Sequence, residues 1–396
     1  MKVLFLTVSY MGDLGVRGIY TDLLRTFVKN GHSVYAVCPF ERRTKRRTAL
    51  AESGRAAILG VRTLNIQKTN FIEKGVGTLL LERQYMRALR KYLRDVEFDL
   101  VLYTTPPITL NRVIRYVKRQ SGAKSYLLLK DIFPQNAVDL GLFSRRNPLY
   151  RMFRQKERAL YRLSDRIGCM SPANVRYLLA HNPEIGPERV EVAANSIEVL
   201  ERPAPDKRKC RRYFDLPTDK PVFLYGGNLG KPQGIEFLIR CMDANADRTD
   251  CHFVIVGSGT ELPKLQAWYA SRRPASVTVL EGLPKNEYDK LVPGCDIGMI
   301  FLDHRFTIPN YPSRLLSYLE NKMPVICATD PNTDIGTIAE ENGYGYWCES
   351  NSTESFTALV DKMLSSDIKQ MGERAFRFLQ EHYAVERTYQ TIVGNV

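Results

Sequence analysis

Short apolar runs alternate with amphipathic stretches along almost the whole chain. The runs of the first half lie at 2–8, 33–38, 100–103, 125–129, 166–170 and 190–193. Those of the second half lie at 221–225, 252–256, 277–280, 297–301, 324–328 and 345–347. Stretches between them, such as 20–30 and 79–93, repeat apolar residues with the 3.6-residue period of a helix. Strands that are apolar throughout are buried on both faces, so the pattern predicts parallel sheets covered by helices on both sides.

The length of 396 residues exceeds what one hydrophobic core usually serves. The segment 201–207, Glu-Arg-Pro-Ala-Pro-Asp-Lys, breaks any helix and is the expected linker. We therefore expect an α/β fold of two Rossmann-like, doubly wound domains that face each other across a cleft. The expected domains are residues 1–202 and 203–379, and a C-terminal helix, about 380–396, is expected to return to the first domain.

Positive charge is concentrated in the first half of the chain. Residues 1–200 carry a formal charge of +17, whereas the remainder carries −3. Such asymmetry indicates an anionic partner of the first half, either a membrane surface or a nucleic acid. No run of 18 apolar residues occurs, so no membrane span is predicted and a cytosolic location is expected. The eight cysteines are scattered without a C-x-x-C pair, which is typical of reduced thiols.

Four segments of the second half combine a strand end, a Gly or Pro break and a helix start. They lie at 223–234, 253–259, 279–284 and 309–320. Backbone N–H groups at such turns are unpaired donors that bind anions. Ligands in these folds bind at the carboxyl ends of the strands, so the second domain is predicted to bind a phosphate-bearing molecule. The P-loop ending Gly-Lys-Ser/Thr is missing, and ATP hydrolysis is not expected.

Each of these motifs also has a purely structural interpretation. The segment 227–234 alone is compatible with an ordinary Gly-rich turn. Ser313 is a good N-cap for the helix 314–320, and Arg314 offers a fork for phosphate oxygens, although a solvated Arg is the alternative. The loop 12–18 reads G-x-x-G-x-x-G and not G-x-G-x-x-G, so nicotinamide or flavin binding is not expected. This loop, with Gly15 and Arg17, is expected on the acceptor side of the interdomain cleft.

The order and spacing of these motifs resemble the retaining glycosyltransferases of family 4, which have the two-domain GT-B fold. Within that family the chain is most similar to bacterial enzymes that build O-antigen, capsule or exopolysaccharide repeat units. The segments that carry the resemblance are 227–234, 256–259, 281–284, 312–319 and 324–326, with 31–34, 130–134 and 192–195 in the first half.

The resemblance implies a site for a nucleotide-sugar donor, with a UDP-sugar favoured. Gly227, Asn228 and Lys231 would border the diphosphate. Gly257 would lie beside the nucleoside, and Leu283 would contact the base. The residues expected to hold the diphosphate by side chain and helix N-terminus are Ser313, Arg314, Leu315 and Leu316.

The chain departs from the family pattern at four of its positions. Asn228 and Gln233 stand where the family commonly has Arg and Lys. Pro309 and Ser317 stand where it often has two glutamates. Glu320 lies one turn later on roughly the same helix face, and we include it among the donor-site candidates. These replacements shift the binding of the donor onto Lys231, Ser313 and Arg314.

The resemblance implies transfer of a hexosyl or N-acetylhexosaminyl group with retention of configuration. Oriented donors stabilise the leaving diphosphate, and the acceptor hydroxyl attacks from the same face of the sugar. Asp131, at the end of the apolar run 126–129, is the candidate catalytic carboxylate, with a turn cap as the alternative. No D-x-D motif is suitably placed, so no metal or other cofactor is expected.

The basic first half is expected to meet an anionic membrane surface and a lipid-diphosphate-linked saccharide acceptor. The loop 42–47 is rich in Arg and Lys, and the stretch 149–162 interleaves apolar and basic residues at helical spacing. A solvated charged face is the alternative. Nucleic-acid binding is not expected, because no recognised module is present.

The sequence therefore predicts a cytoplasmic glycosyltransferase, peripheral on the inner face of the membrane, in polysaccharide biosynthesis. One alternative is a sugar-nucleotide 2-epimerase or hydrolase of the same fold. The other is a membrane scaffold protein with a degenerate donor site.

Overall fold

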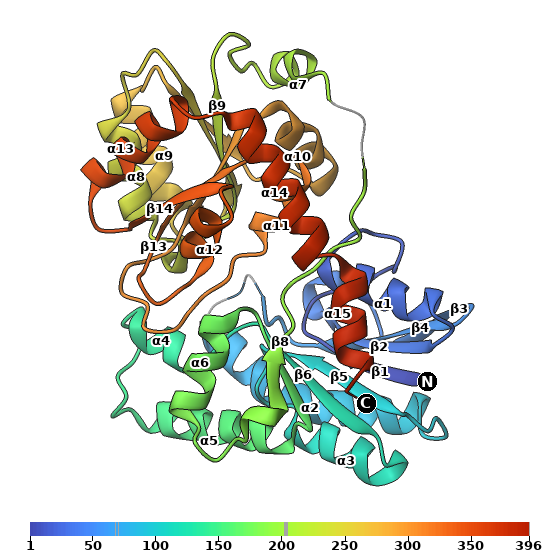
Figure 1. The fold of residues 1–396 in the computed structure, drawn as a ribbon. Coiled ribbons are helices and arrows are strands. Elements are labelled where there is room, and N and C mark those ends of the chain that lie inside the picture. The colour runs from blue at the N-terminus through green and yellow to red at the C-terminus, as the bar shows by residue number, and fades with distance from the viewer. Residues whose placement is uncertain (68, 70, 202–204, 396) are drawn as a thin grey trace. The chain divides into compact units, whose positions relative to one another are not determined.

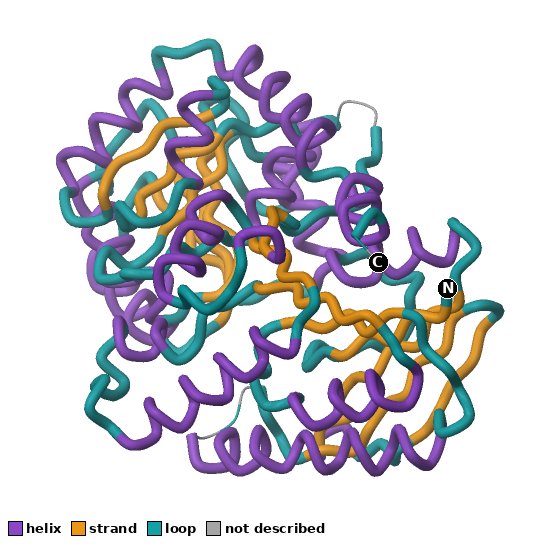
Figure 2. Tube along the Cα trace, turned by 60° about the horizontal axis from the view of Figure 1, so that its bottom comes forward, coloured by secondary structure: helices purple, strands orange, loops and turns teal. Residues whose placement is uncertain are grey.

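The computed structural model describes residues 1–67, 69, 71–201 and 205–395 and divides the chain into two compact units (Figure 1). Unit 1 comprises Met1–Glu198 and Val385–Val396, and unit 2 comprises Val199–Ala384. The boundary expected between residues 202 and 203 lies outside the described residues. In both units the strands lie inside and helices cover them on both sides, as the tube view shows (Figure 2).

Unit 1 is built on an eight-stranded sheet in the order β3-β4-β2-β1-β5-β6-β7-β8. All neighbouring strands pair in parallel except β3 and β4. Its strands are β1 (Lys2–Leu6), β2 (Ser33–Glu41), β3 (Ala49–Ser53), β4 (Ala56–Thr63), β5 (Leu100–Thr104), β6 (Lys124–Leu129), β7 (Arg166–Cys169) and β8 (Val190–Val192). The six apolar runs predicted in this half all form strands.

The antiparallel pair β3–β4 was not predicted from the sequence. Its turn contains Gly54 at a φ of 58°, a conformation that Gly adopts without steric cost. Ala, Glu and Ser dominate β3, and these residues have low strand propensity. Pairing of β4 with β2 over eight residue pairs places this segment in the sheet despite its composition.

Two groups of helices cover the sheet of unit 1. The helices are α1 (Ile19–Lys29), α2 (Phe71–Tyr92), α3 (Asn111–Ser121), α4 (Gln135–Asp139), α5 (Pro148–Leu163), α6 (Pro172–His181) and α15 (Val385–Val393). Helices α1 and α15 lie side by side on one face, where they bury Phe27 and Tyr389 against β1, β2 and β5 (Figure 1). Helices α2, α3 and α5 pack in sequence on the other face.

The helical stretch expected at the C-terminus is interrupted. Helix α14 (Ile368–His382) belongs to unit 2, whereas α15 belongs to unit 1. Val385 and Ile392 of α15 are fully buried. Each such side chain contributes roughly 1.5–3 kcal/mol of burial free energy, which holds the last helix on unit 1.

Unit 2 is a six-stranded, fully parallel sheet in the order β11-β10-β9-β12-β13-β14. Its strands are β9 (Val222–Asn228), β10 (His252–Ser258), β11 (Val277–Glu281), β12 (Ile297–Phe301), β13 (Val325–Thr329) and β14 (Gly345–Glu349). All six were predicted. This is the strand order of dinucleotide-binding Rossmann folds, in which the switch point lies between the first and fourth strands, here β9 and β12.

The remaining helices precede, connect or follow the strands of unit 2. They are α7 (Lys207–Tyr213), α8 (Ile235–Ala244), α9 (Leu262–Arg272), α10 (Lys285–Leu291), α11 (Arg314–Glu320), α12 (Ile335–Glu341), α13 (Thr353–Leu364) and α14. Strands β12 and β13 are buried at every residue, which explains their continuous apolar sequences. Over the described part of the chain, no helix combines the length and apolar character needed to cross a membrane.

Candidate functional site

The carboxyl ends of β9 and β10 and the loops that follow them lie in close backbone contact, next to the switch point of unit 2. A Cβ atom on Gly257 would lie 1.9 Å from the carbonyl oxygen of Gly227, and one on Gly259 would lie 2.2 Å from that of Leu229. Gly227 itself has a φ of 127°. Only Gly fits these positions. Because Gly has no side chain, the backbone at the carboxyl end of the sheet is uncovered, and a ligand can approach it closely.

Asn228 and Gln233 brace the loop after β9. The Asn228 amide donates to Gln233 Oε1 at 2.7 Å, and the Gly230 N–H donates to the same oxygen at 3.3 Å. These two residues stand at positions that are commonly basic in the family the sequence resembles, and here they bond to each other. Lys231 begins the short 3-10 turn that follows and is exposed. It is therefore the cation that this loop offers to solvent.

Arg314 lies beneath Gly227 without a carboxylate partner. Its guanidinium carbon is 4.3 Å from the centre of the Tyr225 ring and 3.5 Å from the place of a Gly227 side chain. Nη1 is enclosed and has no hydrogen-bond partner, and no ion pair of Arg314 is found among the described residues. Burial acts to lower the pKa of Arg314, but the neighbouring tyrosines outweigh it and the pKa is raised overall. The guanidinium is thus charged, and an enclosed charge without an anionic partner is costly unless an anion binds to it.

Three tyrosines surround this guanidinium. The Tyr318 hydroxyl accepts the Gly226 N–H at 3.0 Å, which ties α11 to the end of β9. A side chain on Gly226 would lie 2.2 Å from the Tyr288 hydroxyl. Burial raises the pKa values of Tyr225, Tyr288 and Tyr318, so all three hydroxyls stay neutral at physiological pH. None of the three tyrosines was assigned to the site from the sequence. The one available signal was Tyr225 directly before Gly226 and Gly227, because a buried strand would more commonly carry an apolar Phe there.

Helix α11 provides less backbone for an anion than its sequence suggested. The N–H groups of Leu315 and Leu316 bond to the carbonyls of Pro312 and Ser313, and both leucine side chains are in the core. Ser313 stands at the N-cap position, but its side chain makes no capping hydrogen bond, contrary to the expectation. Its φ of −66° and ψ of −13° are already helical, whereas a capping side chain needs extended backbone.

Glu320 is the last residue of α11, six residues after Arg314, which is about 9 Å along the helix axis. Its assignment to the donor site stays a prediction. Leu283 lies near the carboxyl end of β10. It follows Gly282, whose Cβ position is 3.2 Å from the Ser258 side chain, and it is partly buried.

Asp131 of unit 1 lies just past the carboxyl end of β6. The Thr105 hydroxyl accepts the N–H groups of Lys130 and Asp131 at 3.0 and 3.2 Å. Burial, reinforced by the charge of Asp131, raises the pKa of Tyr20 to about 12, while a hydrogen bond to Thr104 acts against this. A carboxylate beside a neutral phenol at a strand end is a suitable place to orient a hydroxyl group.

The loop with Gly15 and Arg17 is anchored within unit 1. The Gly15 N–H donates to Asp13 Oδ1 at 2.8 Å. Arg17 donates to the carbonyl of Glu198, which fixes the loop to the end of the unit. The acceptor role of these residues stays a prediction.

The basic segments predicted from the sequence are partly neutralised. In the loop 42–47, Arg42 pairs with Glu73 at 2.9 Å, and Arg43 pairs with Glu41. In α5, Arg154 pairs with Glu157 at 2.7 Å. Further along α5, Arg158 and Arg162 pair with Glu184, at 2.7 and 3.4 Å. Within the described ranges, no cluster of three His, Cys, Asp or Glu residues is arranged to hold a metal ion.

Two family models match the chain, one in each half. Residues 15–199 match "Glycosyltransferase Family 4", and residues 206–377 match "Glycosyl transferases group 1". WbjE of Pseudomonas aeruginosa, described as a probable glycosyltransferase, is 22% identical over 319 residues, covering 80% of this chain and 78% of WbjE. WcaI of Escherichia coli (strain K12), a glycosyl transferase whose description names colanic acid biosynthesis, is 23% identical over 302 residues, covering 74% of this chain and 69% of WcaI.

Solved structures that cover nearly the whole chain share the fold. WaaG, a glycosyltransferase involved in lipopolysaccharide biosynthesis, aligns with a TM-score of 0.66 at 14% identity, over 99% of this chain and 100% of WaaG. HepE of Anabaena in complex with UDP aligns with a TM-score of 0.67 at 13% identity, over 100% and 99% of the two chains. An E. coli trehalose-6-phosphate protein bound with UDP-2-fluoro glucose aligns with a TM-score of 0.76 at 9% identity, over 100% and 98%.

The fold of each unit and these matches define the class: the protein is a glycosyltransferase with the GT-B fold. The chain belongs to glycosyltransferase family 4, whose two models together match residues 15–199 and 206–377.

Proposed function

We propose that the protein transfers a sugar from a UDP-sugar to a lipid-linked saccharide, with retention of configuration, in polysaccharide biosynthesis. The observation that carries the proposal is the enclosed guanidinium of Arg314, which lacks a carboxylate partner and lies beneath bare glycine backbone at the switch point. A diphosphate bound there would provide the missing negative charge.

The similar proteins support the choice of donor and pathway. Two of the structures named above hold UDP or a UDP-sugar, which favours uracil as the base. WcaI and WaaG are described with colanic acid and lipopolysaccharide biosynthesis, both of which yield surface polysaccharides. We therefore assign Leu283 to the base, Gly257 to the nucleoside and Gly227, Asn228, Lys231, Ser313 and Arg314 to the diphosphate.

The proposed reaction breaks the bond between the anomeric carbon and the diphosphate oxygen. The acceptor hydroxyl forms the new bond on the same face of the sugar, and its proton passes to the departing diphosphate oxygen. Arg314 and Lys231 stabilise the charge that develops on that diphosphate, as preorganised cations do in water-excluded sites. We propose that no metal ion is needed, because these side chains and the glycine-rich backbone provide the stabilisation.

The acceptor is assigned to the carboxyl edge of the sheet in unit 1. Asp131 would orient the acceptor hydroxyl, and Tyr20 next to it would complete the hydrogen bonding. Gly15 and Arg17 are assigned to the acceptor side. A lipid-diphosphate acceptor lies in a membrane, so the enzyme is proposed to act peripherally at the cytoplasmic face.

The test is nucleotide release from UDP- and GDP-sugars with and without extracted lipid-linked saccharide. Release of UDP that depends on the acceptor supports the proposal, and the anomeric configuration of the product, read by NMR, tests retention. Consumption of the donor without an acceptor would identify a 2-epimerase or hydrolase instead. Absence of nucleotide binding in calorimetry would leave only a scaffold role.

A further inference from the structure

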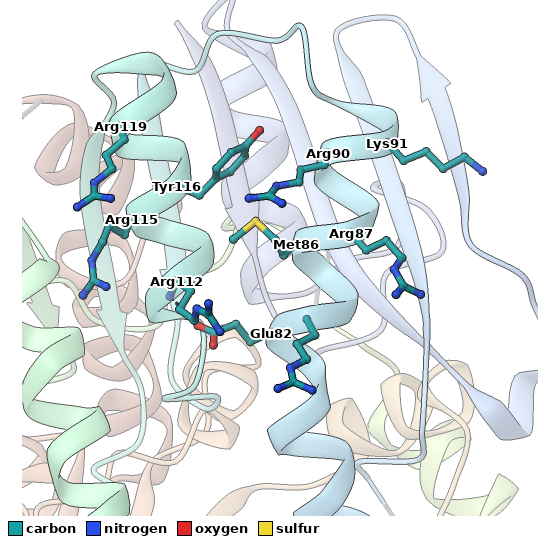
Figure 3. Close-up of a pocket in the computed structure, with 10 residues that line it drawn as sticks. Glu82, Met86, Arg87, Arg90, Lys91, Arg112, Arg115, Tyr116 and Arg119 are labelled. Atoms are coloured by element: carbon teal, nitrogen blue, oxygen red, sulfur yellow. Dashed lines mark hydrogen bonds between the residues drawn. The ribbon is translucent and has the colours of Figure 1, made fainter.

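Helices α2 and α3 of unit 1 form an open groove of about 840 Å³ that is lined by basic side chains (Figure 3). Helix α2 contributes Arg83, Arg87, Arg90 and Lys91. Helix α3 contributes Arg112, Arg115 and Arg119. Figure 3 shows Arg90 and Tyr116 pointing toward each other across the groove, with the arginines of α3 along its other margin.

These seven cations have no carboxylate partners within the part of the chain that the structure describes. None of them occurs in an ion pair. The single acidic residue of the groove, Glu82, accepts the backbone N–H of Arg112 at 2.6 Å. The guanidinium of Arg90 lies 5.0 Å from the Tyr116 ring, which holds it in the groove without neutralising it. Like charges at this density repel one another, so the surface favours an anionic partner.

The exposed stripe of α2 continues beyond the basic residues as an apolar surface. Positions 76, 79, 83, 87 and 90 fall on one side of a helix with 3.6 residues per turn. Val76 is 46% exposed and Leu79 is 48% exposed. Exposed apolar residues in line with unpaired cations are typical of surfaces that insert into the interface of an anionic bilayer.

Helix α5, which the sequence predicts to face the membrane, differs from the α2–α3 groove in its ion pairs. Three of its arginines pair with Glu157 or Glu184, whereas the seven cations that line the α2–α3 groove form no ion pair in the described part of the chain. More of the positive charge therefore remains available to a partner in the α2–α3 groove than in α5.

We infer that the α2–α3 groove, together with Val76 and Leu79, is the surface by which unit 1 docks on an anionic lipid bilayer, its cations over lipid phosphates and the two apolar side chains in the interface. A nucleic acid would use the cations but would leave Val76 and Leu79 in water. The inference rests on the proposed function only in that a lipid-linked acceptor requires a membrane-bound enzyme.

The experiment is flotation of the full chain with vesicles that contain 30% anionic phospholipid, compared with neutral vesicles. The charge-reversal variant R83E/R87E/R90E is expected to bind anionic vesicles at least tenfold more weakly than the unchanged chain. The matched control is R208E/K209E/R212E on α7, which makes the same charge change at exposed positions of unit 2 and is expected to keep vesicle binding within twofold. The variant V76S/L79S, with no change of charge, is expected to weaken binding about threefold or more.

Equal loss of vesicle binding in the α2 and α7 variants would overturn the inference. Vesicle binding would then depend on the total charge of the protein and not on the groove. Tighter binding to a 20-base-pair DNA duplex than to anionic vesicles at the same salt concentration would also overturn it. Calorimetry with UDP on the same proteins separates this inference from the proposed function. If R83E/R87E/R90E still binds UDP, the membrane-binding surface is separate from the donor site. If the unchanged chain binds vesicles but not UDP, only the assignment of the donor site is contradicted.

Discussion

Arg314 in unit 2 and the α2–α3 groove in unit 1 present positive charge in two different ways. Arg314 is a single guanidinium with an enclosed Nη1, held between aromatic rings under a glycine loop. The groove has seven exposed cations on two helix surfaces. An enclosed charge is screened little by water or salt, so one residue can bind a small anion strongly. Exposed charges are each weak and act together on an extended anionic surface.

The difference shows that the density of basic residues in a sequence does not locate a ligand site. The first half carries the basic excess of the chain, yet the donor site is assigned to the half with a formal charge of −3. What distinguishes Arg314 is its environment, which holds the guanidinium in place before a ligand arrives. The following predictions test this contrast, from the largest expected effect to the smallest.

Replacing Arg314 by Met is expected to lower the affinity for UDP at least 100-fold. Loss of one partner of a desolvated charge pair costs about 2–5 kcal/mol or more, and each 1.4 kcal/mol is tenfold in affinity. Isothermal titration calorimetry measures this. Lys231→Met is the comparison, with an expected loss of about tenfold, because Lys231 is exposed. Equal affinities of R314M and the unchanged chain would show that Arg314 is structural.

The same variant is expected to be as stable as the unchanged chain, or more stable, when no nucleotide is present. Met removes an enclosed charge that lacks a carboxylate partner and leaves an apolar side chain among three tyrosines. Thermal unfolding with and without UDP measures the effect. A stabilisation by UDP should be seen only in the unchanged chain. A marked loss of stability in R314M without nucleotide would indicate that the guanidinium mainly supports the fold.

Gly257→Ala is expected to destabilise unit 2 and to weaken UDP binding together. The added methyl group would lie 1.9 Å from the Gly227 carbonyl oxygen, so the ends of β9 and β10 must separate, at a cost of about 1–3 kcal/mol for overpacking. Urea denaturation and calorimetry report the two effects. Gly75→Ala on α2 is the control, since nothing lies within 4 Å of its Cβ position and Ala favours a helix. If G257A bound UDP normally, close contact between the loops would not matter for the donor.

Salt is expected to separate the two kinds of site. Raising the ionic strength from 0.05 to 0.5 M should weaken vesicle binding by more than tenfold, because it shortens the screening length to a few ångströms, about 4 Å. Binding of UDP should fall by less than about threefold, because the guanidinium of Arg314 is enclosed. Flotation and calorimetry at the two salt concentrations give the comparison. An equal salt dependence of both would remove the distinction between the sites.

Lys130 provides a smaller test on an enclosed cation of unit 1. Burial lowers the pKa of its ammonium group to about 7, and its one recorded side-chain hydrogen bond is to the Ala193 carbonyl at 3.2 Å. The unfolded chain therefore binds one more proton than the folded chain between about pH 7 and the pKa of a free lysine, about 10.4. The contribution of this lysine to the free energy of unfolding thus rises with pH in that window.

The measurement is urea denaturation of the unchanged chain and of Lys130→Met at several pH values. The difference in unfolding free energy, unchanged chain minus variant, is expected to increase between pH 7 and 9. Taking the difference cancels the opposite trend from buried groups that do not interact with Lys130, such as Cys38 and Tyr126, whose raised pKa values favour unfolding at high pH. A difference that does not vary with pH would contradict the lowered pKa.

The strands and the helix over 314–320 could be predicted because long apolar runs and their breaks are local signals. The β3–β4 hairpin could not, because its Ala-rich segment depends on pairing with β2. The tyrosines around Arg314 come from three separate elements, and only the folded chain shows that they meet. The ion pairs of α5 could not be predicted either, because Glu184 pairs with two arginines that lie more than 20 residues away in the sequence.

The most direct test of the assignment of Arg314 is a crystal structure of the protein with UDP. We expect a diphosphate oxygen within hydrogen-bond distance of the Arg314 guanidinium and of the backbone at Gly227. A nucleotide bound elsewhere, with Nη1 of Arg314 still lacking a partner, would contradict this assignment.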